Sequence, residues 1–547
     1  MADVSTIKHS SALEPLKSPT YRAFWTAAVV TNTGLFMQDV GASWLMTSLS
    51  TDPFMIALMQ TAQTLPAFIL ALPCGALADV LDRRKLLLLG QLWMMTAAIS
   101  LAALTLTGHI TPWLLLGLTF MLFVGVAAGA PAWSAITPDI VPRKHLEAAI
   151  GLGSAGYNVA RGLGAALGGV IVGAFGPGWV FLANASCYSA MINALCRWNA
   201  KSNARQKSTE NITGAIRAGV RYTRHSQALR AILMRTIVFA TAASALWSLL
   251  PLLAREQLHL NSMQYGIMVS SFGVGTFLGA LILPRMRRRL TLDLMSASGT
   301  ILFAVSLAVV ACSHHFFNGC IGMLGCGIAW TIKNSSLNVA VQFAAPNWVR
   351  GRAYSIYLLV FQGCTAGGAM IWGAIARSHS MTEAMLCASA ALLVGLFMSY
   401  WFKLAHAEHL DLVESTHWED PELTHEIPAI DDGPVMVTVQ YVIEPEAAKE
   451  FMEAMKALEI QRRRDGAFQW YVFRDLADES KFCETFLVDT WGEHMRQHQR
   501  VTMNDRAAEQ RVDSFHIGAG KPVVNHYIAA TGATVATAAT GQSAQQT

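Results

Sequence analysis

The stretch "GALADVLDRRK" (residues 75–85) lies between two long hydrophobic runs, and "GALILPRMRRR" (residues 279–289) repeats its pattern 204 positions later. Similarity at one fixed offset is the mark of an internal duplication. The sequence therefore predicts two halves built on one plan. The same offset relates further pairs: Pro142 and Pro346, Asn158 and Gln362, Gly164 and Gly368, and Gly169 and Gly373.

The composition indicates that the hydrophobic runs cross a membrane. Of the 547 residues, 53% are hydrophobic and only 14% are charged, unlike a soluble domain. We predict an all-α polytopic protein in the lipid bilayer, with twelve transmembrane helices in two six-helix pseudo-repeats and a binding site between the halves. A span needs about 20 apolar residues, and the candidates start near Phe24, Phe54, Lys85, Trp113, Leu146, Trp179, Leu229, Tyr265, Leu292, Phe316, Ala353 and Glu383.

Basic residues gather in alternate loops, and this asymmetry predicts the orientation in the membrane. Loops rich in lysine and arginine face the cytoplasm, so we expect both termini there, in a multi-pass protein of the cell inner membrane. The predicted parts are a tail (1–21), a first half (22–198), a basic central loop (199–228) and a second half (229–404). The formal net charge of +4 is too small to indicate a nucleic-acid partner.

Four ionisable residues interrupt the predicted spans, where charge is costly and marks a functional position. They are Asp39, Arg161, Arg235 and Lys333. Asp39 lies near mid-depth of the first span, beside Gln38. Because a carboxyl group removed from water takes up a proton more readily, Asp39 is the predicted site of proton coupling.

The basic residues in the spans admit more than one interpretation. Arg161 shares a helix face with Asn158. We expect it to partner Asp39 or to contact an anionic group of a substrate, and a purely structural ion pair with Asp39 is the equal alternative. Lys333 starts the polar segment "KNSS", which needs partners or a wet cavity. Arg235 is close enough to a helix end to extend its charge toward water. The substrate and proton-coupling candidates are Gln38, Asp39, Asn158, Arg161, Lys333 and Gln362.

The opening stretch also resembles a known family. The loop with Gly75, Leu77, Asp79, Arg83 and Arg84 resembles the signature loop of the major facilitator superfamily, and residues 279–289 resemble a weaker copy of it. This chain has "DRRK" where the family often has "GRRK". The form with aspartate resembles the drug- and siderophore-exporter branch of the family. Residues 31–50 and 148–169 are similar to that branch too. The resemblance implies twelve helices that move by alternating access and export small molecules.

Within this loop we expect a state-dependent latch at the cytoplasmic face. Gly75 permits close helix approach, and Asp79 supplies a negative charge that Arg83 or Arg84 meets in one state only. A plain orientation anchor is the alternative, but it explains neither the acid nor the glycine. The predicted latch residues are Gly75, Asp79, Arg83, Arg84, Asp139, Arg350 and Arg352.

The C-terminal part has a different character, because 24 of the 36 acidic residues lie after residue 404. An acidic linker (405–432) precedes a patterned segment (433–528), and the final residues (529–547) are of low complexity, which is typical of disorder. The alternating and amphipathic runs of the patterned segment predict the order β-α-β-β-α-β of a small α+β ferredoxin-like domain, which we place in the cytoplasm. It resembles the antibiotic biosynthesis monooxygenase-like domains fused to some exporters, and the resemblance implies a homodimer formed through the sheets.

No motif in the chain indicates catalysis. His494 and His498 share a helix face, a spacing compatible with a metal ion, but the sequence shows no third ligand. Phosphate-binding loops, nucleophile motifs and CxxC pairs are absent from the sequence. We therefore expect a transporter with no catalytic residues, cofactor or metal.

The predicted function is secondary active, proton-coupled export of small amphipathic molecules that resemble drugs or siderophores. The predicted partners are that substrate, protons and lipid. The alternatives are an importer or uniporter without proton coupling, a membrane sensor, and an enzyme fusion that acts through the C-terminal domain.

Overall fold

The computed structural model describes residues 13–80, 82–198, 212–404, 411–415, 417–418, 421 and 428–529. By their contacts, the residues divide into two compact units. The first comprises Met1–Lys207, Ala231–Ala340 and Ser355–Ala405, and the second comprises Ser208–Arg230, Val341–Tyr354 and His406–Thr547. The predicted disordered tail lies outside the described residues apart from Ala529, and so does much of the predicted linker.

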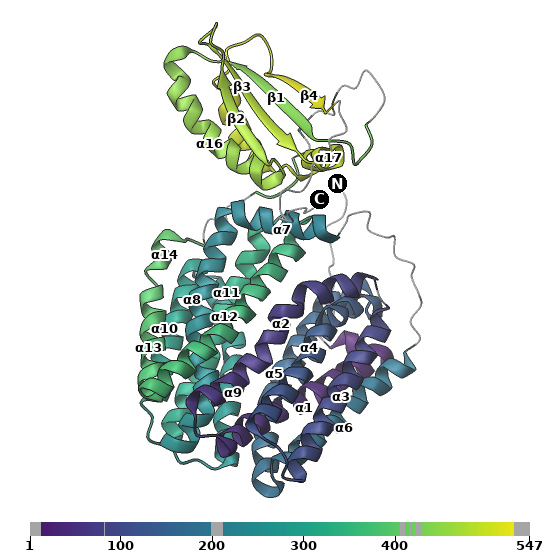
Figure 1. Cartoon of the computed structure of the whole chain (residues 1–547), viewed down its shortest axis with the longest axis vertical. Coiled ribbons are helices and arrows are strands. Elements are labelled where there is room, and N and C mark those ends of the chain that lie inside the picture. The colour runs from purple at the N-terminus through teal and green to yellow at the C-terminus, as the bar shows by residue number, and fades with distance from the viewer. Residues whose placement is uncertain are drawn as a thin grey trace, which may run out of the picture. The chain divides into compact units, whose positions relative to one another are not determined.

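In the part of the chain that the structure describes, twelve long helices build the membrane part, and each starts within five residues of the predicted start of a span. A π-helical turn, Leu253–Gln257, extends the seventh of them, and the short helix α14 (Met398–Trp401) follows the last. The long helices run side by side (Figure 1). They are α1 (Pro19–Leu49), α2 (Pro53–Val80), α3 (Arg83–Leu106), α4 (Pro112–Ile140), α5 (Leu146–Phe175), α6 (Pro177–Arg197), α8 (Gln227–Leu252), α9 (Ser262–Arg287), α10 (Leu292–Ala311), α11 (Phe316–Ala344), α12 (Arg350–Ser378) and α13 (Met381–Gly395).

Among the described residues, ten helices are long and apolar enough to cross a membrane by length and composition. The helices α1 and α11 are not among the ten, and they are the helices that carry Asp39 and Lys333. Helix α1 packs against both α5 and α6, so neighbouring helices cover much of its polar surface. Polar residues thus concentrate in helices of the bundle interior, which is where a membrane protein tolerates them.

Glycines bring α5 and α9 into backbone contact. A Cβ atom on Gly169 would lie 2.6 Å from the carbonyl oxygen of Ser262, and one on Gly266 would lie 2.7 Å from that of Ala165. The glycine-rich run of α5 is therefore a packing surface. Gly373, the counterpart of Gly169 in the repeat, makes a similar approach on the other side, since its Cβ would lie 2.5 Å from Ala57 in α2.

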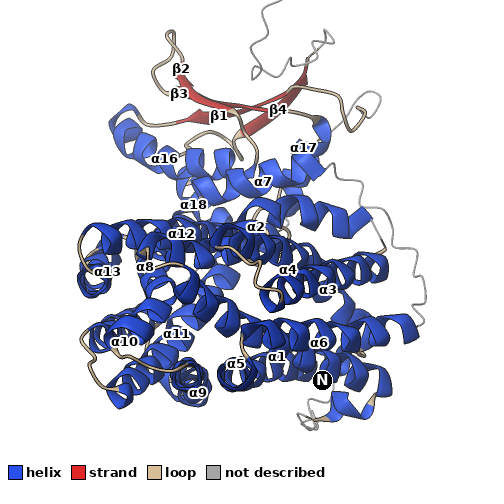
Figure 2. Ribbon diagram, turned by 60° about the horizontal axis from the view of Figure 1, so that its bottom comes forward, coloured by secondary structure: helices blue, strands red, loops and turns tan. Residues whose placement is uncertain are grey.

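The second unit contains a four-stranded antiparallel sheet in the order β2-β3-β1-β4. Figure 2 shows α16, α17 and α18 on one face of it. The predicted order β-α-β-β-α-β is confirmed, but the second helix is broken, because Thr502 caps α18 and ends the run begun by α17. The elements are β1 (Val435–Val442), α16 (Ala448–Asp465), β2 (Gln469–Arg474), β3 (Lys481–Val488), α17 (Trp491–Arg500), α18 (Met503–Asp513) and β4 (Val523–Ile528).

The predicted central loop contains a helix of its own, α7 (Ile212–His225), which belongs to the second unit. It has apolar and basic residues on different faces. From the sequence, this stretch was predicted to be part of a basic cytoplasmic connection.

An ion cluster lies in the interior of the sheet domain. Arg462 donates from Nε to Glu484 at 3.1 Å and from Nη1 to Glu509 at 2.7 Å. Burial opposes ionisation of Glu509 most strongly, but attraction to Arg462 and hydrogen bonds from His417 and Trp418 outweigh it and lower its pKa to about 2. Glu509 is therefore ionised at neutral pH, and its ion pair with Arg462 is retained.

We predict that Gly169→Ala destabilises the membrane part. The added methyl group meets backbone atoms that cannot move aside independently, so the free energy of unfolding falls by about 1–3 kcal/mol. The matched control is Gly151→Ala in the same helix, where a Cβ meets nothing within 4 Å and stability rises by up to about 1 kcal/mol. Thermal unfolding in detergent measures both. Equal melting temperatures for the two variants would remove the glycine contact as a determinant of stability.

Candidate functional site

Asp39 lies in a small pocket to which both halves of the membrane part contribute. Its Oδ1 accepts a hydrogen bond from Nε2 of Gln63 in α2 at 2.5 Å. The opposite wall comes from the second half, with Trp247 of α8 and Tyr265 of α9. The rest of the lining mixes polar and apolar side chains, and Ser43 and Gln60 are its further polar members. A carboxyl group with one amide partner therefore lies where the two predicted repeats meet.

Arg161 is held by aromatic rings instead of a carboxylate. Its guanidinium lies 5.2 Å from the ring centres of Phe36 and Tyr157 and 5.8 Å from that of Phe272. Nη2 also donates to the hydroxyl of Tyr157 at 3.4 Å. Arg161 is near enough to Asp39 to interact with it electrostatically, yet no ion pair within 4 Å joins them in the described part of the chain. The structure thus brings the two predicted residues together without the salt bridge that the sequence analysis considered.

A larger, mainly apolar pocket lies within the first half, between α1, α4 and α5. Five aromatic residues line it, and Asn32, Thr137 and Ser154 add polar groups. Because Tyr157 lines this pocket and also contacts Arg161, the pocket and the Arg161 rings are adjacent. The aromatic residues were not among the predicted site residues; they are Tyr21, Phe24, Trp25, Trp133 and Tyr157.

A signal for this pocket was present in the sequence of α1. Tyr21, Trp25, Asn32, Phe36 and Asp39 recur at helical spacing, so they form a stripe along one side of the helix. The stripe carries aromatic and polar groups from the pocket to the acid. Its periodicity is detectable from sequence, although its partners on α4 and α5 are not.

Three other predicted substrate residues lie on α1, α5 and α12. Gln38 accepts a hydrogen bond from Asn184, so it faces α6. Asn158 donates to the carbonyl oxygen of Ser154, one turn earlier in the same helix, at 3.1 Å. Gln362 is half-buried in α12. None of these three lines the pocket of Asp39.

A second polar cluster occupies the other half. Lys333 is buried and donates from Nζ to Ser296 Oγ at 2.7 Å. Arg235 was expected to extend toward water, and this expectation is wrong: only 4% of it is exposed, and it forms an ion pair with Asp293. Its Nε donates to the carbonyl oxygen of Phe402 at 2.7 Å. Asp293 was not among the predicted residues, because an acidic residue in the first turn of a helix is common for its favourable interaction with the helix N-terminus alone.

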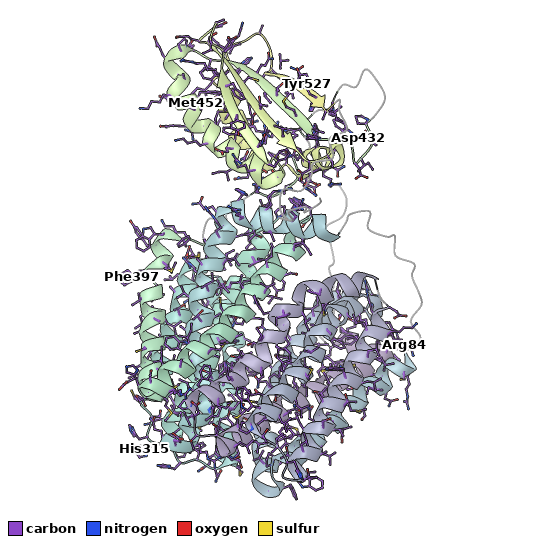
Figure 3. All side chains as sticks on the ribbon, in the orientation of Figure 1. Arg84, His315, Phe397, Asp432, Met452 and Tyr527 are labelled. Carbon is purple, nitrogen blue, oxygen red and sulfur yellow. The ribbon has the colours of Figure 1, made fainter. Side chains whose placement is uncertain are left out.

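The predicted latch is visible only in part. Asp79 and Asp139 lie in α2 and α4, but their side chains are outside the described residues, as are those around Gly75. Arg84 (Figure 3) donates from Nη2 to the carbonyl oxygen of Cys196 at 2.9 Å, at the end of α6. Asp82 caps α3 by accepting from the backbone N–H of Arg84, also at 2.9 Å.

Two of the remaining latch arginines lie in the first turn of α12, and the third lies at the start of α3. Arg83 is half-buried at the start of α3. Arg350 donates from Nε to the carbonyl oxygen of Ala345 at 3.3 Å. The side chain of Arg352 packs against α7, because a Cβ on Gly219 would lie 2.9 Å from its Cβ. Arg350 and Arg352 therefore fasten the connection before α12.

In the sheet domain, the structure supplies the third histidine that the sequence did not reveal. His526 of β4 joins His494 and His498 of α17, and one ring nitrogen from each lies within 4.8 Å of the others. Burial, followed by the two neighbouring rings, lowers the pKa of His494 to about 3. The expectation of a histidine pair without a third partner is corrected, because β4 returns beside α17 from a distant part of the sequence.

The sheet domain also contacts the two connections that belong to its unit. Glu493 of α17 accepts from Arg221 of α7 at 2.6 Å. The guanidinium of Arg500 lies 4.1 Å from the ring centre of Trp348, in the connection between α11 and α12. Arg464 lies over Tyr222 of α7 at 5.3 Å. Charge and aromatic stacking therefore join the domain to both segments.

Comparison with solved structures supports the fold. The nucleoside transporter NupG aligns with a TM-score of 0.58 at 12% identity, over 70% of this chain and 99% of that one. A bacterial homologue of the human lysosomal transporter Spinster, in an inward-facing unoccupied conformation, aligns with a TM-score of 0.56 at 14% identity, over 71% and 98%. At such identities the likeness concerns the fold alone.

Sequence relatives include transporters of two kinds. The staphyloferrin A transporter of Staphylococcus aureus (strain NCTC 8325 / PS 47) is 20% identical over 61% of this chain and 84% of the relative. Macrolide efflux protein A of Streptococcus pyogenes is 20% identical over 47% and 68%. A family model described as "transmembrane secretion effector" matches residues 10–534, which include the sheet domain. The chain therefore belongs to the transmembrane secretion effector family of major facilitator transporters, which are multi-pass membrane proteins.

Proposed function

We propose that this protein is a secondary active exporter of small amphipathic molecules, driven by proton exchange at Asp39. The observation that carries the proposal is the position of Asp39 in a pocket walled by both halves. In alternating access the halves open to one side of the membrane at a time, so a group between them meets each side in turn. We place the protein in the inner membrane with both termini in the cytoplasm, because the basic loops favour that orientation.

The surroundings of Asp39 suit a group that gains and loses a proton. Gln63 Nε2 donates to the carboxyl group whether it is charged or neutral. Burying the charged form away from water is costly, so closure of the pocket favours the neutral form and opening to water favours release of the proton. Arg161 is kept nearby by Phe36, Tyr157 and Phe272. Its charge is therefore available to Asp39 or to an anionic substrate group.

The aromatic pocket is the proposed route for the cargo. Its flat apolar lining with a few polar groups suits molecules that have an apolar body and a polar end. The relatives' names refer to a siderophore and to macrolides, and efflux in one of those names supports export as the direction. An importer or a uniporter would use the same pocket without a requirement for Asp39.

The sheet domain is proposed to act in assembly or regulation, without catalysis. The sheet face opposite the helices exposes Tyr471 and Phe473, which are 53% and 56% exposed. Aromatic side chains on an open sheet face are typical of an interface, so this face is the proposed contact of a homodimer.

The first test replaces the proton-binding group. Asp39→Asn keeps the shape and can still accept from Gln63, but it cannot exchange a proton. We expect gradient-driven flux in proteoliposomes to fall to background across a panel of amphipathic compounds that includes macrolides and siderophores. Substrate counterflow, which needs no net proton movement, should persist. The matched control is Asp82→Asn, since asparagine caps a helix as well as aspartate does. Full gradient-coupled flux in Asp39→Asn would exclude Asp39 as the coupling site.

The second test separates the charge of Arg161 from its planar shape. Arg161→Lys retains the charge but stacks poorly on the three rings. We expect the KM for transported compounds to rise up to about tenfold, because a lysine that the rings no longer hold must be ordered on binding at a cost of about 0.5–1.5 kcal/mol, while kcat changes little. Arg22→Lys, at an exposed position of α1, is the control. An unchanged KM in Arg161→Lys would exclude stacking as a part of substrate binding.

The third test concerns the proposed latch. Asp79→Asn removes the charge that Arg83 or Arg84 would meet in one state. We expect slower turnover with largely retained substrate affinity, because a latch affects the exchange between states and not the binding pocket. Turnover and equilibrium binding are measured on the same preparation. Normal turnover would favour the orientation anchor.

A further inference from the structure

The three histidines of the sheet domain converge from two elements. His494 and His498 are four residues apart on α17, so their rings project from one helix face. His526 lies on β4, opposite Val437 of β1 in the antiparallel register. Val437 is buried in the domain core, and directly opposed residues share a sheet face, so His526 points to the side covered by the helices.

The donor atoms have the spacing of a metal site. Nε2 of His494 and Nε2 of His498 are 3.3 Å apart. Two nitrogen ligands at about 2.0–2.1 Å from a tetrahedral zinc ion are separated by about 3.3 Å. The third ring is within the same group, in which one nitrogen of each histidine lies within 4.8 Å of the others. A small movement of the His526 side chain would complete three corners of a tetrahedron.

A neighbouring amide group orients the ring of His494. Nδ1 of His494 lies 3.2 Å from Oε1 of Gln497, an oxygen that can only accept. His494 therefore carries its proton on Nδ1, and its Nε2 presents a lone pair to the cluster. A ligand histidine whose other nitrogen donates to an oxygen is the usual arrangement around a bound metal.

The walls of the cluster are aromatic. Trp491 lies 5.6 Å from the ring of His494, and Trp418 lies 5.0 Å from that of His498. The ligand group contains imidazole nitrogens only, with no carboxylate. Such a set selects borderline transition metals and disfavours magnesium and calcium, which require oxygen ligands.

We propose that His494, His498 and His526 bind one transition-metal ion of the zinc class, with the fourth position left to water or a small ligand. The ion would link α17 to the last strand of the sheet. Since α17 also carries Glu493 and Arg500, which contact α7 and Trp348, metal binding would stabilise the helix that holds these two connections.

The test is metal titration of the full-length protein, purified in detergent through a tag without histidine and stripped of metal with a chelator. Co²⁺ serves as the visible probe, because tetrahedral Co²⁺ absorbs strongly, and Zn²⁺ should displace it. We expect one ion per chain, a melting temperature that rises with Zn²⁺, and no competition from Mg²⁺.

Variants assign the ligands. His498→Gln and His526→Gln, both at half-buried positions, should each weaken Zn²⁺ binding by more than about a hundredfold, and Gln497→Leu by roughly 10–100-fold, as loss of an outer partner does. His315→Gln, at an exposed histidine of the membrane part (Figure 3), should bind as wild type does. Absence of binding in the wild type would overturn the proposal, as would unchanged affinity in both His498→Gln and His526→Gln. Neither result depends on the proposed transport function.

Discussion

The backbone contact between α5 and α9 is the constraint on which the membrane part depends. Gly169 and Gly266 bring the two halves as close as main chains permit. On its other side, α5 meets α1 through Gly164 and Gly168, where a Cβ would lie 2.6 Å from the carbonyl oxygen of Thr33 and 2.8 Å from that of Met37. One helix of small residues thus sets the spacing between the helix of Asp39 and the helix of Tyr265. The pocket of the acid has its present width because neither neighbour of α5 is held off by side chains.

The two halves share a plan, but the arginines within their spans have different surroundings. Arg235 is neutralised by Asp293 and by carbonyl oxygens, which fixes α8 to α10 and to the end of the bundle. Arg161 is enclosed by rings that stabilise a cation without cancelling its charge. A paired charge of this kind contributes to architecture, whereas an unneutralised one can respond to a proton or a ligand.

A structural feature could be predicted from the sequence where the residues that determine it lie close together in the chain. Helix positions were predictable to within a turn or two, because a span needs a continuous apolar run of fixed length. The close packing at the glycines of α5 was also predictable, because small residues recur at helical spacing within that one helix. Asp39 and Arg161 were selected because charge in a span is rare. Asp293 and His526 were not selected, because the role of each depends on a partner that is distant in the sequence. The packing of the helices and strands determines which residue that partner is. The aromatic pocket was predictable only in part. The residues that α1 contributes recur at helical spacing, whereas those of its other walls show no such pattern in the sequence.

The grouping of α7, the Trp348 connection and the sheet domain in one unit has a practical consequence for any shortened form of the protein. Tyr222 stacks edge-on against Trp348, with 5.5 Å between ring centres, while Arg464 and Arg500 cover the two rings from the domain side. Removal of the residues after 432 would uncover both rings and leave Arg221 without Glu493. A truncated chain would lack the domain and would also expose a new aromatic surface. Poor expression or aggregation caused by that surface could be mistaken for evidence that transport requires the domain. Single substitutions such as Glu493→Gln avoid that confusion, because they loosen one contact and leave the surface covered.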